Sequence, residues 1–365
     1  MKAYHILYHT DEDGTAAAAV TYEYLKRISK RDNEKVRYFF YKIDYTTNIQ
    51  SLLGNIHDGD EIFLVDYSFS KKENLEFILD LADRGFDVTW IDHHKTSVDI
   101  LAGEAFKDID VFDYNNFHIC VETDMCGACV AYLYFCNILN GMANEEDLKT
   151  IKYLAYVNSY DIWKFDMPNT KQFNYGIRAL NHTPRNIFSM ILNYDPSLVS
   201  ELFNCDDKSE KFYDAMESFT NKIINDGKII EKYCDNENKQ VCDQYAFEYF
   251  IRDFVENRVY KCIAVNKRGN SSMFGDLIND YDIVTPFIFN GEQYVYSLYT
   301  NNDNVDCERL AKILGTYDGL GGGGHLKAAG FQTYDPIIED NCTVNITRRL
   351  FTFLHKDKYS VFISE

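Results

Sequence analysis

The chain has 365 residues, of which 46% are apolar and 26% are charged, so roughly two domains with sizeable cores are expected. With only 5 prolines and 19 glycines, the composition excludes wholesale disorder and collagen-like or low-complexity sequence. The 57 acidic and 37 basic residues give a net charge of −20, which argues against stable binding of long duplex nucleic acid or of a membrane surface.

The first half of the sequence alternates between strand-like and helical segments. Short apolar runs predict strands, and amphipathic periodicity predicts the helices between them. Such alternation is typical of an α/β domain with a mainly parallel sheet. The predicted elements are a strand at Ala3–Tyr8, a helix at Thr15–Ser29, strands at Lys35–Ile43 and Glu61–Val65, a helix at Lys71–Arg84 that ends at Gly85, a strand at Asp87–Ile91, and mostly helix from Glu122 to about Tyr160.

The second half predicts a smaller α+β unit. A long charged helix at Asp206–Tyr233 and a polar turn at 235–239 precede it. We therefore predict a catalytic domain over 1–205, a linker helix and turn over 206–240, and a second domain over 241–365. The elements predicted in the second domain are strands at Phe247–Phe250, Tyr260–Asn266, Ile283–Phe289 and Tyr294–Tyr299, a helix at Cys307–Leu314, and a glycine run at Gly321–Gly324.

The cellular compartment is predicted to be the cytoplasm. No apolar run reaches the ~18 residues of a membrane span, and the N-terminal segment MKAYHILYHTDEDG does not have the pattern of a secretory signal. In that compartment the ten cysteines are expected to be reduced. Cys126 and Cys129 form a Cys-x-x-Cys pair, but they open an apolar helical stretch, and we predict that they pack in the core.

Ionisable residues follow three of the predicted N-terminal strands. His9, Asp11 and Asp13 follow the first, and Asp66 follows the strand Glu61–Val65. The carboxyl ends of parallel strands meet at one edge of the sheet, where such folds bind ligands. Each group alone has an ordinary explanation, such as a helix N-cap or a surface pair, but the three together indicate a site. The third group, after Asp87–Ile91, is Asp92, His93 and His94.

The chemistry of these residues indicates bound cations. Several carboxylates in one crevice repel each other unless cations neutralise them. Imidazole nitrogens mixed with carboxylate oxygens suit Mn²⁺, Fe²⁺, Co²⁺ or Zn²⁺ better than Ca²⁺. A set this rich indicates two ions ~3.5–4 Å apart, the arrangement that hydrolyses phosphate esters. We expect Mn²⁺ to be the preferred ion, with Mg²⁺ or Co²⁺ as alternatives.

The motifs H-T-D-E-D-G, V-D-Y-S and D-H-H, in this order, resemble the first three motifs of the DHH phosphoesterase family in the RecJ-like superfamily. The segment Y-V-N-S-Y-D-I-W-K-F of this chain, which contains Asp161, resembles the fourth motif of the family. The resemblance implies that His9, Asp11 and Asp66 bind one metal, and that Asp13, Asp66, His93 and Asp161 bind the other. It also implies that Asp66 bridges the two ions, that Asp92 orients an imidazole, and that His94 faces the substrate phosphate.

The glycine stretch G-G-G-G-H-L-K-A-A-G-F at 321–331 resembles the signature of the DHH-associated C-terminal domain. Glycine backbone N–H groups can approach an anion closely, and the residues after the run could begin a helix whose N-terminus favours phosphate. A mobile linker is the alternative, but the apolar continuation favours a packed ligand loop. The predicted substrate-binding residues in it are Gly322, Gly323, Gly324, His325 and Lys327.

One position departs from the family pattern. Many relatives have S-L-R-S in the strand before the loop, and its arginine contacts substrate phosphate. Here the segment is Ser297-Leu298-Tyr299-Thr300. Tyr299 could stack on a base instead, or Arg268 or Lys327 could supply the positive charge.

The resemblance, together with the site chemistry, predicts an enzyme of the nanoRNase and oligoribonuclease type. It would hydrolyse very short oligonucleotides to mononucleotides by two-metal hydroxide attack, with His94, Asp92 and Asp66 as catalytic residues. The alternative substrates are a linear or cyclic (di)nucleotide, phosphoadenosine phosphate and, less favoured, pyrophosphate or polyphosphate. A metal-binding scaffold without activity is a third hypothesis. We expect a monomer or a homodimer, with a small nucleotide substrate as its partner.

Overall fold

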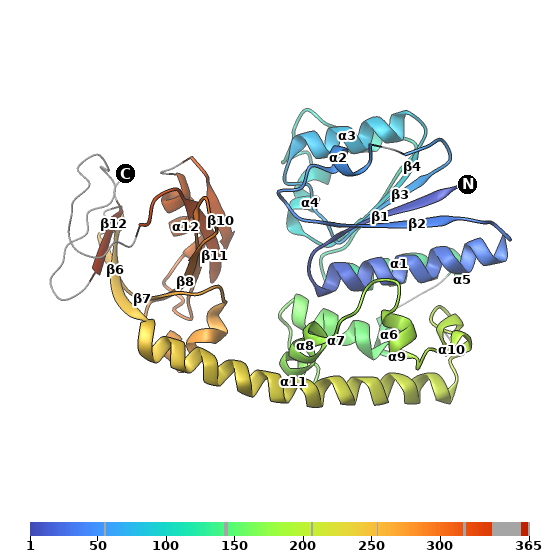
Figure 1. Cartoon of the computed structure of the whole chain (residues 1–365). Helices are drawn as coiled ribbons and strands as arrows, with labels where there is room; N and C mark the ends of the chain where they lie inside the picture. The colour runs from blue at the N-terminus through green and yellow to red at the C-terminus, as the bar shows by residue number, and fades with distance from the viewer. Residues whose placement is uncertain are drawn as a thin grey trace. The chain divides into compact units, whose positions relative to one another are not determined.

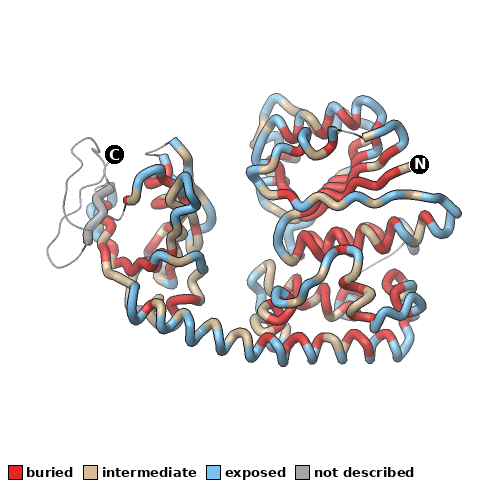
Figure 2. The backbone as a smooth tube through the Cα atoms, in the orientation of Figure 1, coloured by how far each residue is buried: buried red, intermediate tan, exposed pale blue. Residues whose placement is uncertain are grey.

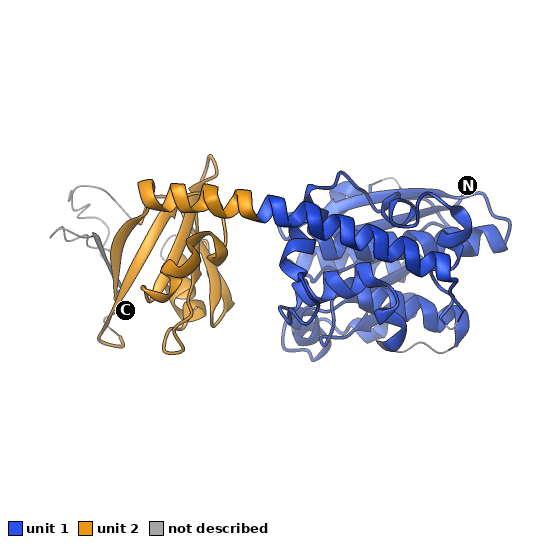
Figure 3. Cartoon of the chain, turned by 90° about the horizontal axis from the view of Figure 1, so that it is seen from below, with its two compact units in different colours: residues 1–231 blue, residues 232–365 orange. Residues whose placement is uncertain are grey.

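The computed structural model describes residues 1–54, 56–141, 145–205, 207–253, 255–316, 319–337 and 359–363. The chain divides into two compact units, Met1–Glu231 and Lys232–Glu365 (Figure 3). The division falls inside one helix, α11 (Glu210–Tyr245). The limits predicted from the sequence, 1–205, 206–240 and 241–365, stay a prediction.

The first unit is built on a parallel five-stranded sheet, as predicted. The strand order is β2-β1-β3-β4-β5, and all the neighbouring pairs are parallel. Because the strands are parallel, their carboxyl ends lie at the same edge of the sheet. The strands are β1 (Ala3–His9), β2 (Arg37–Ile43), β3 (Glu61–Val65), β4 (Asp87–Asp92) and β5 (Phe117–Val121).

Helices cover both faces of this sheet (Figure 1). α1 (Glu12–Arg31) and α5 (Gly127–Asn140) pack on one face, and the short elements α2 (Ile49–Leu52) and α4 (Lys95–Leu101) lie with α3 (Lys72–Asp83) on the other. Two buried apolar clusters correspond to the two faces (Figure 2).

Small side chains allow α1 to approach the sheet and α5 closely. Residues 16–19 are four consecutive alanines with no exposed surface. Each fully buried alanine removes apolar surface from water at almost no cost in side-chain entropy. α1 begins directly after β1, where the Asp11 carboxylate accepts a hydrogen bond from the Gly14 N–H and caps the helix.

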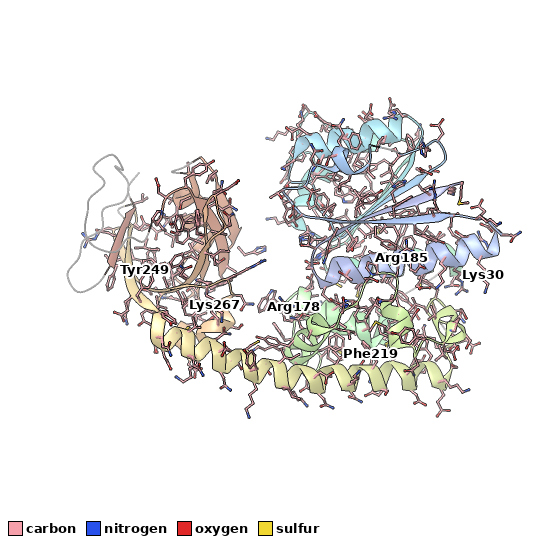
Figure 4. All side chains as sticks on the ribbon, viewed as in Figure 1. Lys30, Arg178, Arg185, Phe219, Tyr249 and Lys267 are labelled. Carbon is pink, nitrogen blue, oxygen red and sulfur yellow. The ribbon has the colours of Figure 1, made fainter. Side chains whose placement is uncertain are left out.

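A layer of helices packs against the outer side of α1 and α5. Phe219 of α11 is partly buried against this core (Figure 4). At the edge strand β2, the Arg185 guanidinium donates a hydrogen bond to the Tyr38 carbonyl and lies 5.0 Å from the centre of the Phe40 ring. The helices of the layer are α6 (Glu145–Lys149), α7 (Lys152–Asp161), α8 (Thr170–Ala179), α9 (Ile187–Ile191), α10 (Pro196–Ser200) and the first part of α11.

The second unit is a mixed seven-stranded sheet with strand order β10-β11-β9-β8-β7-β6-β12. Helix α12 (Cys307–Thr316) packs on one face, where Tyr249 is fully buried (Figure 4), and the 3₁₀ segment η2 (Ser271–Asn279) packs on the other. The α+β class predicted for this unit is confirmed. Its strands are β6 (Phe247–Asp253), β7 (Arg258–Asn266), β8 (Ile283–Phe289), β9 (Tyr294–Tyr299), β10 (Gly322–His325), β11 (Ala328–Thr333) and β12 (Tyr359–Ile363).

Two local predictions are wrong. Residues 235–239 do not form a turn, because α11 continues as helix through them to Tyr245. The residues after the glycine run do not begin a helix: Gly322–His325 and Ala328–Thr333 pair as an antiparallel hairpin, and β11 also pairs with β9. Pairing with an existing sheet therefore overrides the helix propensity of the two alanines at 328 and 329.

The prediction for the Cys-x-x-Cys pair is confirmed. Cys126 and Cys129 are buried, and both are free thiols in the core beside α1. The described part of the chain contains no helix that is long and apolar enough to cross a membrane.

Candidate metal centre

The candidate ligands converge at the carboxyl edge of the first sheet. His9 ends β1, Asp66 follows β3 directly, and Asp92 ends β4. Two further carboxylates come from helices: Asp13 lies in the first turn of α1, and Asp161 is the last residue of α7. The fold therefore brings residues that are up to 152 positions apart in the sequence (from His9 to Asp161) into one cluster.

Asp66 lies at the centre of this cluster. Its side chain is 1% exposed, and neither carboxylate oxygen has a hydrogen-bond partner. Its backbone has φ = +54°, a conformation that residues other than glycine adopt rarely and that carries strain. A buried carboxylate without donors is costly unless something else compensates its charge. A bound cation is such a compensation.

His93 contacts three carboxylates from three different elements. Its Nε2 atom is 3.3 Å from Asp66 Oδ1, 3.5 Å from Asp161 Oδ2 and 3.6 Å from Asp13 Oδ2. Burial lowers the pKa of His93 below its usual 6.5. The imidazole is thus biased toward its neutral form, which is the form that binds metals.

On the other side of Asp66, His9 and Asp11 form a second group. His9 Nδ1 is 2.7 Å from Asp11 Oδ2 and 3.9 Å from Asp66 Oδ2. The other Asp11 oxygen caps α1, so the carboxylate is held in place by the helix while Oδ2 faces His9. The two groups share Asp66.

Asp13 is held by the N-terminus of α5. Its two oxygens accept hydrogen bonds from the backbone N–H groups of Gly127, at 2.7 Å, and Ala128, at 2.9 Å. The positive end of the helix dipole also favours a negative charge there. Position 127 must be glycine, because a Cβ atom there would be 2.7 Å from the Asp66 Cβ. α5 therefore approaches the centre closely enough to orient one acid and confine another.

Asp92 orients His94. The Asp92 carboxylate is fully buried and contacts His94 Nδ1 at 2.8 Å, and it also accepts a hydrogen bond from the Ser97 hydroxyl. His94 Nε2 is 3.3 Å from the Tyr45 hydroxyl. Burial alone would lower the pKa of His94, but the hydrogen bond and the charge of Asp92 outweigh it and raise that pKa above 6.5.

The acids of the centre disfavour each other's ionisation. Burial raises the pKa of Asp66 well above 3.8, and the charges of Asp13 and Asp11 raise it further. Burial and the same two charges raise the pKa of Asp161 to about 8. Divalent cations would reverse both effects, since they favour the ionised carboxylates.

The donor set matches what a transition-metal ion requires. Among the described residues, three groups have ligand atoms that all lie within 4.8 Å of one another. They contain only carboxylate oxygens and imidazole nitrogens, which suit Mn²⁺ and similar ions. The groups are His9, Asp11 and Asp66; Asp13, His93 and Asp161; and Asp66, His93 and His94.

The residues predicted to bind substrate lie in the second unit. Tyr299 is half-buried on β9 and faces the side of the sheet that η2 covers. His325 pairs with Ala328 of β11, and Ala328 pairs with Tyr299, so all three residues lie on one face. Lys327 makes an ion pair with Asp303, and Arg268 is exposed in the loop between β7 and η2.

Sterics explain two glycines of the run. A Cβ atom at Gly322 would be 2.1 Å from the Ala311 carbonyl oxygen of α12. Gly324 has φ = +144°, and a Cβ there would be 2.6 Å from the Ala328 carbonyl oxygen. By contrast, a Cβ at Gly323 would have nothing within 4 Å. Gly322 and Gly324 are thus required by the hairpin and its helix, whereas Gly323 is open.

The sequence analysis did not identify three residues of the centre, Tyr45, Ser97 and Gly127. Tyr45 follows β2 by two residues, and its ring lies 5.3 Å from that of His9. Extending the strand-end argument to β2 would have found it. Ser97 and Gly127 left no comparable signal, because their roles depend on the packing of α4 and α5.

Removal of metal should make the stability of the protein depend on pH in a defined direction. Between pH 4 and 8 the native state should bind more protons than the unfolded chain, because Asp66 and Asp161 have raised pKa values. The free energy of unfolding in EDTA should therefore fall as the pH rises from about 4 to about 8. Urea unfolding at a series of pH values measures this. Asp66→Asn should flatten the slope, and a free energy that rises across this range would contradict the assignment.

Part of the first unit is similar to a known protein family. The DHH family N-terminal domain matches residues 4–157. Oligoribonuclease NrnB of Bacillus subtilis is 25% identical over 347 residues, which cover 92% of this chain and 74% of NrnB. The uncharacterized protein R106 of Acanthamoeba polyphaga mimivirus is 21% identical over 332 residues, 89% of this chain and 66% of R106.

Solved structures with detectable similarity are more distant. RecJ of Thermus thermophilus in complex with Mn²⁺ has a TM-score of 0.44 at 14% identity, over 91% of this chain and 49% of RecJ. The pGpG-specific phosphodiesterase PggH from Vibrio has a TM-score of 0.40 at 12% identity, over 91% of this chain and 93% of PggH. The segment 4–157, which is similar to the DHH family N-terminal domain, contains the three strand ends and the candidate ligands that lie on or directly after them.

Proposed function

We propose that this protein is a metal-dependent phosphodiesterase that hydrolyses very short oligonucleotides to mononucleotides. The observation that carries the proposal is Asp66, a buried carboxylate without a hydrogen-bond donor, shared by two groups of nitrogen and oxygen ligands. Similarity to a protein named oligoribonuclease along most of the chain supports the substrate class.

In this proposal two divalent ions bind at the centre. His9, Asp11 and Asp66 would hold one ion, and Asp66 would also be a ligand of the other. Bound ions of this kind supply Lewis-acid stabilisation of a phosphoryl group and lower the pKa of water. Mn²⁺ is the favoured ion because imidazole is a better ligand for Mn²⁺ than for Mg²⁺. The second ion would be held by Asp13, Asp66, His93 and Asp161.

His94 acts on the substrate phosphate. Its Nδ1 atom is tied to Asp92, so the ring keeps one orientation and Nε2 stays available. The hydrogen bond and the charge of Asp92 raise the pKa of His94, which favours the protonated imidazole, and its Nε2–H would donate to a phosphate oxygen or to the leaving oxygen. The Tyr45 hydroxyl lies 3.3 Å from the same nitrogen, so it also restrains the ring.

The second unit recognises the nucleotide. His325 and Tyr299 lie on one face with the small Ala328 between them, so a base or sugar can rest over the alanine. Gly323 leaves the backbone open on the same hairpin, and Lys327 and Arg268 contribute positive charge. The net charge of −20 repels the tails of long strands, which favours short substrates.

The defining test compares four substrates with and without divalent metal. A labelled dinucleotide, a 20-mer, pyrophosphate and a cyclic dinucleotide are incubated with Mn²⁺, with Mg²⁺ or with excess EDTA. We expect rapid turnover of the dinucleotide, more with Mn²⁺ than with Mg²⁺, and none in EDTA. Preferred turnover of pyrophosphate or of the cyclic dinucleotide would replace the substrate assignment, and full activity in EDTA would exclude the metal mechanism.

Asp66→Asn should be the most damaging single substitution at the centre. Asparagine tolerates the left-handed backbone at this position, so the fold should be kept. The charge that compensates both ions is lost, and kcat should fall by about 10³-fold or more. His9→Ala, which removes a ligand of one ion, is the comparison. Residual activity of Asp66→Asn above a tenth of wild type would show that the bridge is misassigned.

The hairpin should affect nucleotide turnover separately from phosphodiester cleavage. Gly323→Val fills the open position without a clash, and His325→Ala removes an exposed imidazole. Because binding of remote substrate groups lowers the barrier, both should reduce dinucleotide turnover. Hydrolysis of bis-p-nitrophenyl phosphate should change far less. An equal loss on both substrates, at unchanged metal content, would mean that the hairpin serves folding instead. Gly324→Val is less informative because it breaks the hairpin itself.

A further inference from the structure

An aromatic cluster surrounds Asp161 in the sequence. Tyr160 belongs to α7, and Trp163 and Phe165 lie in the segment between α7 and α8, whose course Figure 1 shows. Trp163 is 64% exposed and Phe165 is 41% exposed. Their ring centres are 5.2 Å apart, and Tyr160 lies 6.0 Å from Trp163 in a stacked arrangement and 5.8 Å from Phe165. The three large rings therefore contact one another, and two of them, Trp163 and Phe165, are exposed to water.

The backbone of this segment is held in an unfavourable conformation. Trp163 has φ = +56° and Phe165 has φ = +48°. Bulky residues rarely adopt positive φ, because the Cβ atom crowds the backbone. Strain of this kind persists only where the surrounding structure enforces it, and it concentrates at functional sites.

Buried groups of α7 enforce the conformation. Ser159 is fully buried; its carbonyl oxygen accepts the Phe165 N–H at 3.0 Å, and its hydroxyl accepts the Met167 N–H at 3.1 Å. The Tyr156 hydroxyl donates to the Pro168 carbonyl at 2.8 Å. The segment is thus fixed by hydrogen bonds at several points. These hydrogen bonds hold two apolar rings in contact with solvent. Such exposure is unfavourable, because the hydrophobic effect favours burial of apolar surface.

We propose that Trp163, supported by Phe165 and Tyr160, is a stacking platform for a base of the nucleotide substrate. This rests on the proposed function, because it requires a phosphate at the metal centre. Trp163 is two residues from Asp161, so their Cα atoms are at most about 7.6 Å apart. A nucleotide whose phosphate contacts the centre can therefore bring its base to the indole. Stacking on an aromatic face accepts every base, so the platform positions substrate without selecting sequence.

The proposal can be tested by fluorescence, without turnover. The chain has two tryptophans, and the other, Trp90, is fully buried with its Nε1–H donated to the Tyr67 carbonyl. Titration with adenosine monophosphate in Mg²⁺ should change the emission of Trp163 saturably, whereas ribose 5-phosphate, which has no base, should not. Trp163→Tyr should abolish the change. Absence of a saturable change with adenosine monophosphate would overturn the platform.

Kinetics supply the second arm. Trp163→Ala should lower kcat/KM for a dinucleotide by about 5- to 150-fold, and Trp163→Tyr should retain most of it. On dinucleotides that lack one base or the other, the effect of Trp163→Ala should disappear for one of the two. Tyr194→Ala is the matched control, since Tyr194 is an aromatic residue of the same unit that is 67% exposed and also has positive φ.

The outcomes separate the two proposals. A wild-type protein that does not hydrolyse any dinucleotide refutes the phosphodiesterase, and the titration still decides the platform. Wild-type turnover with an equal loss for Trp163→Ala on intact and base-free substrates keeps the phosphodiesterase and overturns the platform.

Discussion

The buried charge of Asp66 is the constraint on which the first unit depends. Asp13 and Asp92 are just as buried, but the backbone of α5 compensates one and His94 with Ser97 compensates the other. Asp66 alone among these three has no protein donor, although it lies between both ligand groups. Backbone and side-chain donors therefore stabilise the buried charges of Asp13 and Asp92, whereas the buried charge of Asp66 has no such donor. Of these three acids, Asp66 is the one whose charge depends most on a cation.

Some departures from regular geometry lie at or beside the same centre. Asp66 has a left-handed backbone, Gly127 leaves room beside it for α5, and Trp163 with Phe165 follow Asp161 in strained conformations. Local rules of sequence and backbone are expected to fail where function requires it. In the glycine run of the second unit, by contrast, packing alone explains Gly322 and Gly324. These two glycines are therefore required by the hairpin and α12, and not by a ligand.

Much of this arrangement could be predicted from the sequence. Parallel alternation and the polar residues after β1, β3 and β4 predicted both the sheet and the edge where His9, Asp66 and His93 meet. Asp161 could be included only through family resemblance, because a helix end far along the chain carries no such positional rule. The turn expected at 235–239 failed because asparagine and aspartate disfavour helix only weakly, and α11 continues to Cys242, which is buried against the second sheet. The helix expected after the glycine run was not found for a related reason: the residues at 322–333 pair with an existing sheet, and such pairing depends on tertiary contacts rather than on local propensity.

The arginine at the edge of the first sheet bears on how the protein behaves at high concentration. β2 is an edge strand rich in aromatic residues, and Phe39 on it is 38% exposed. Unprotected edges of this composition add strands from other molecules and so lead to aggregation. Arg185 occupies the Tyr38 carbonyl and lies over Phe40, so an incoming strand would have to displace a charged side chain before it could pair. Arg185, which is remote from the metal centre, thereby protects the folded protein against aggregation through the edge strand β2.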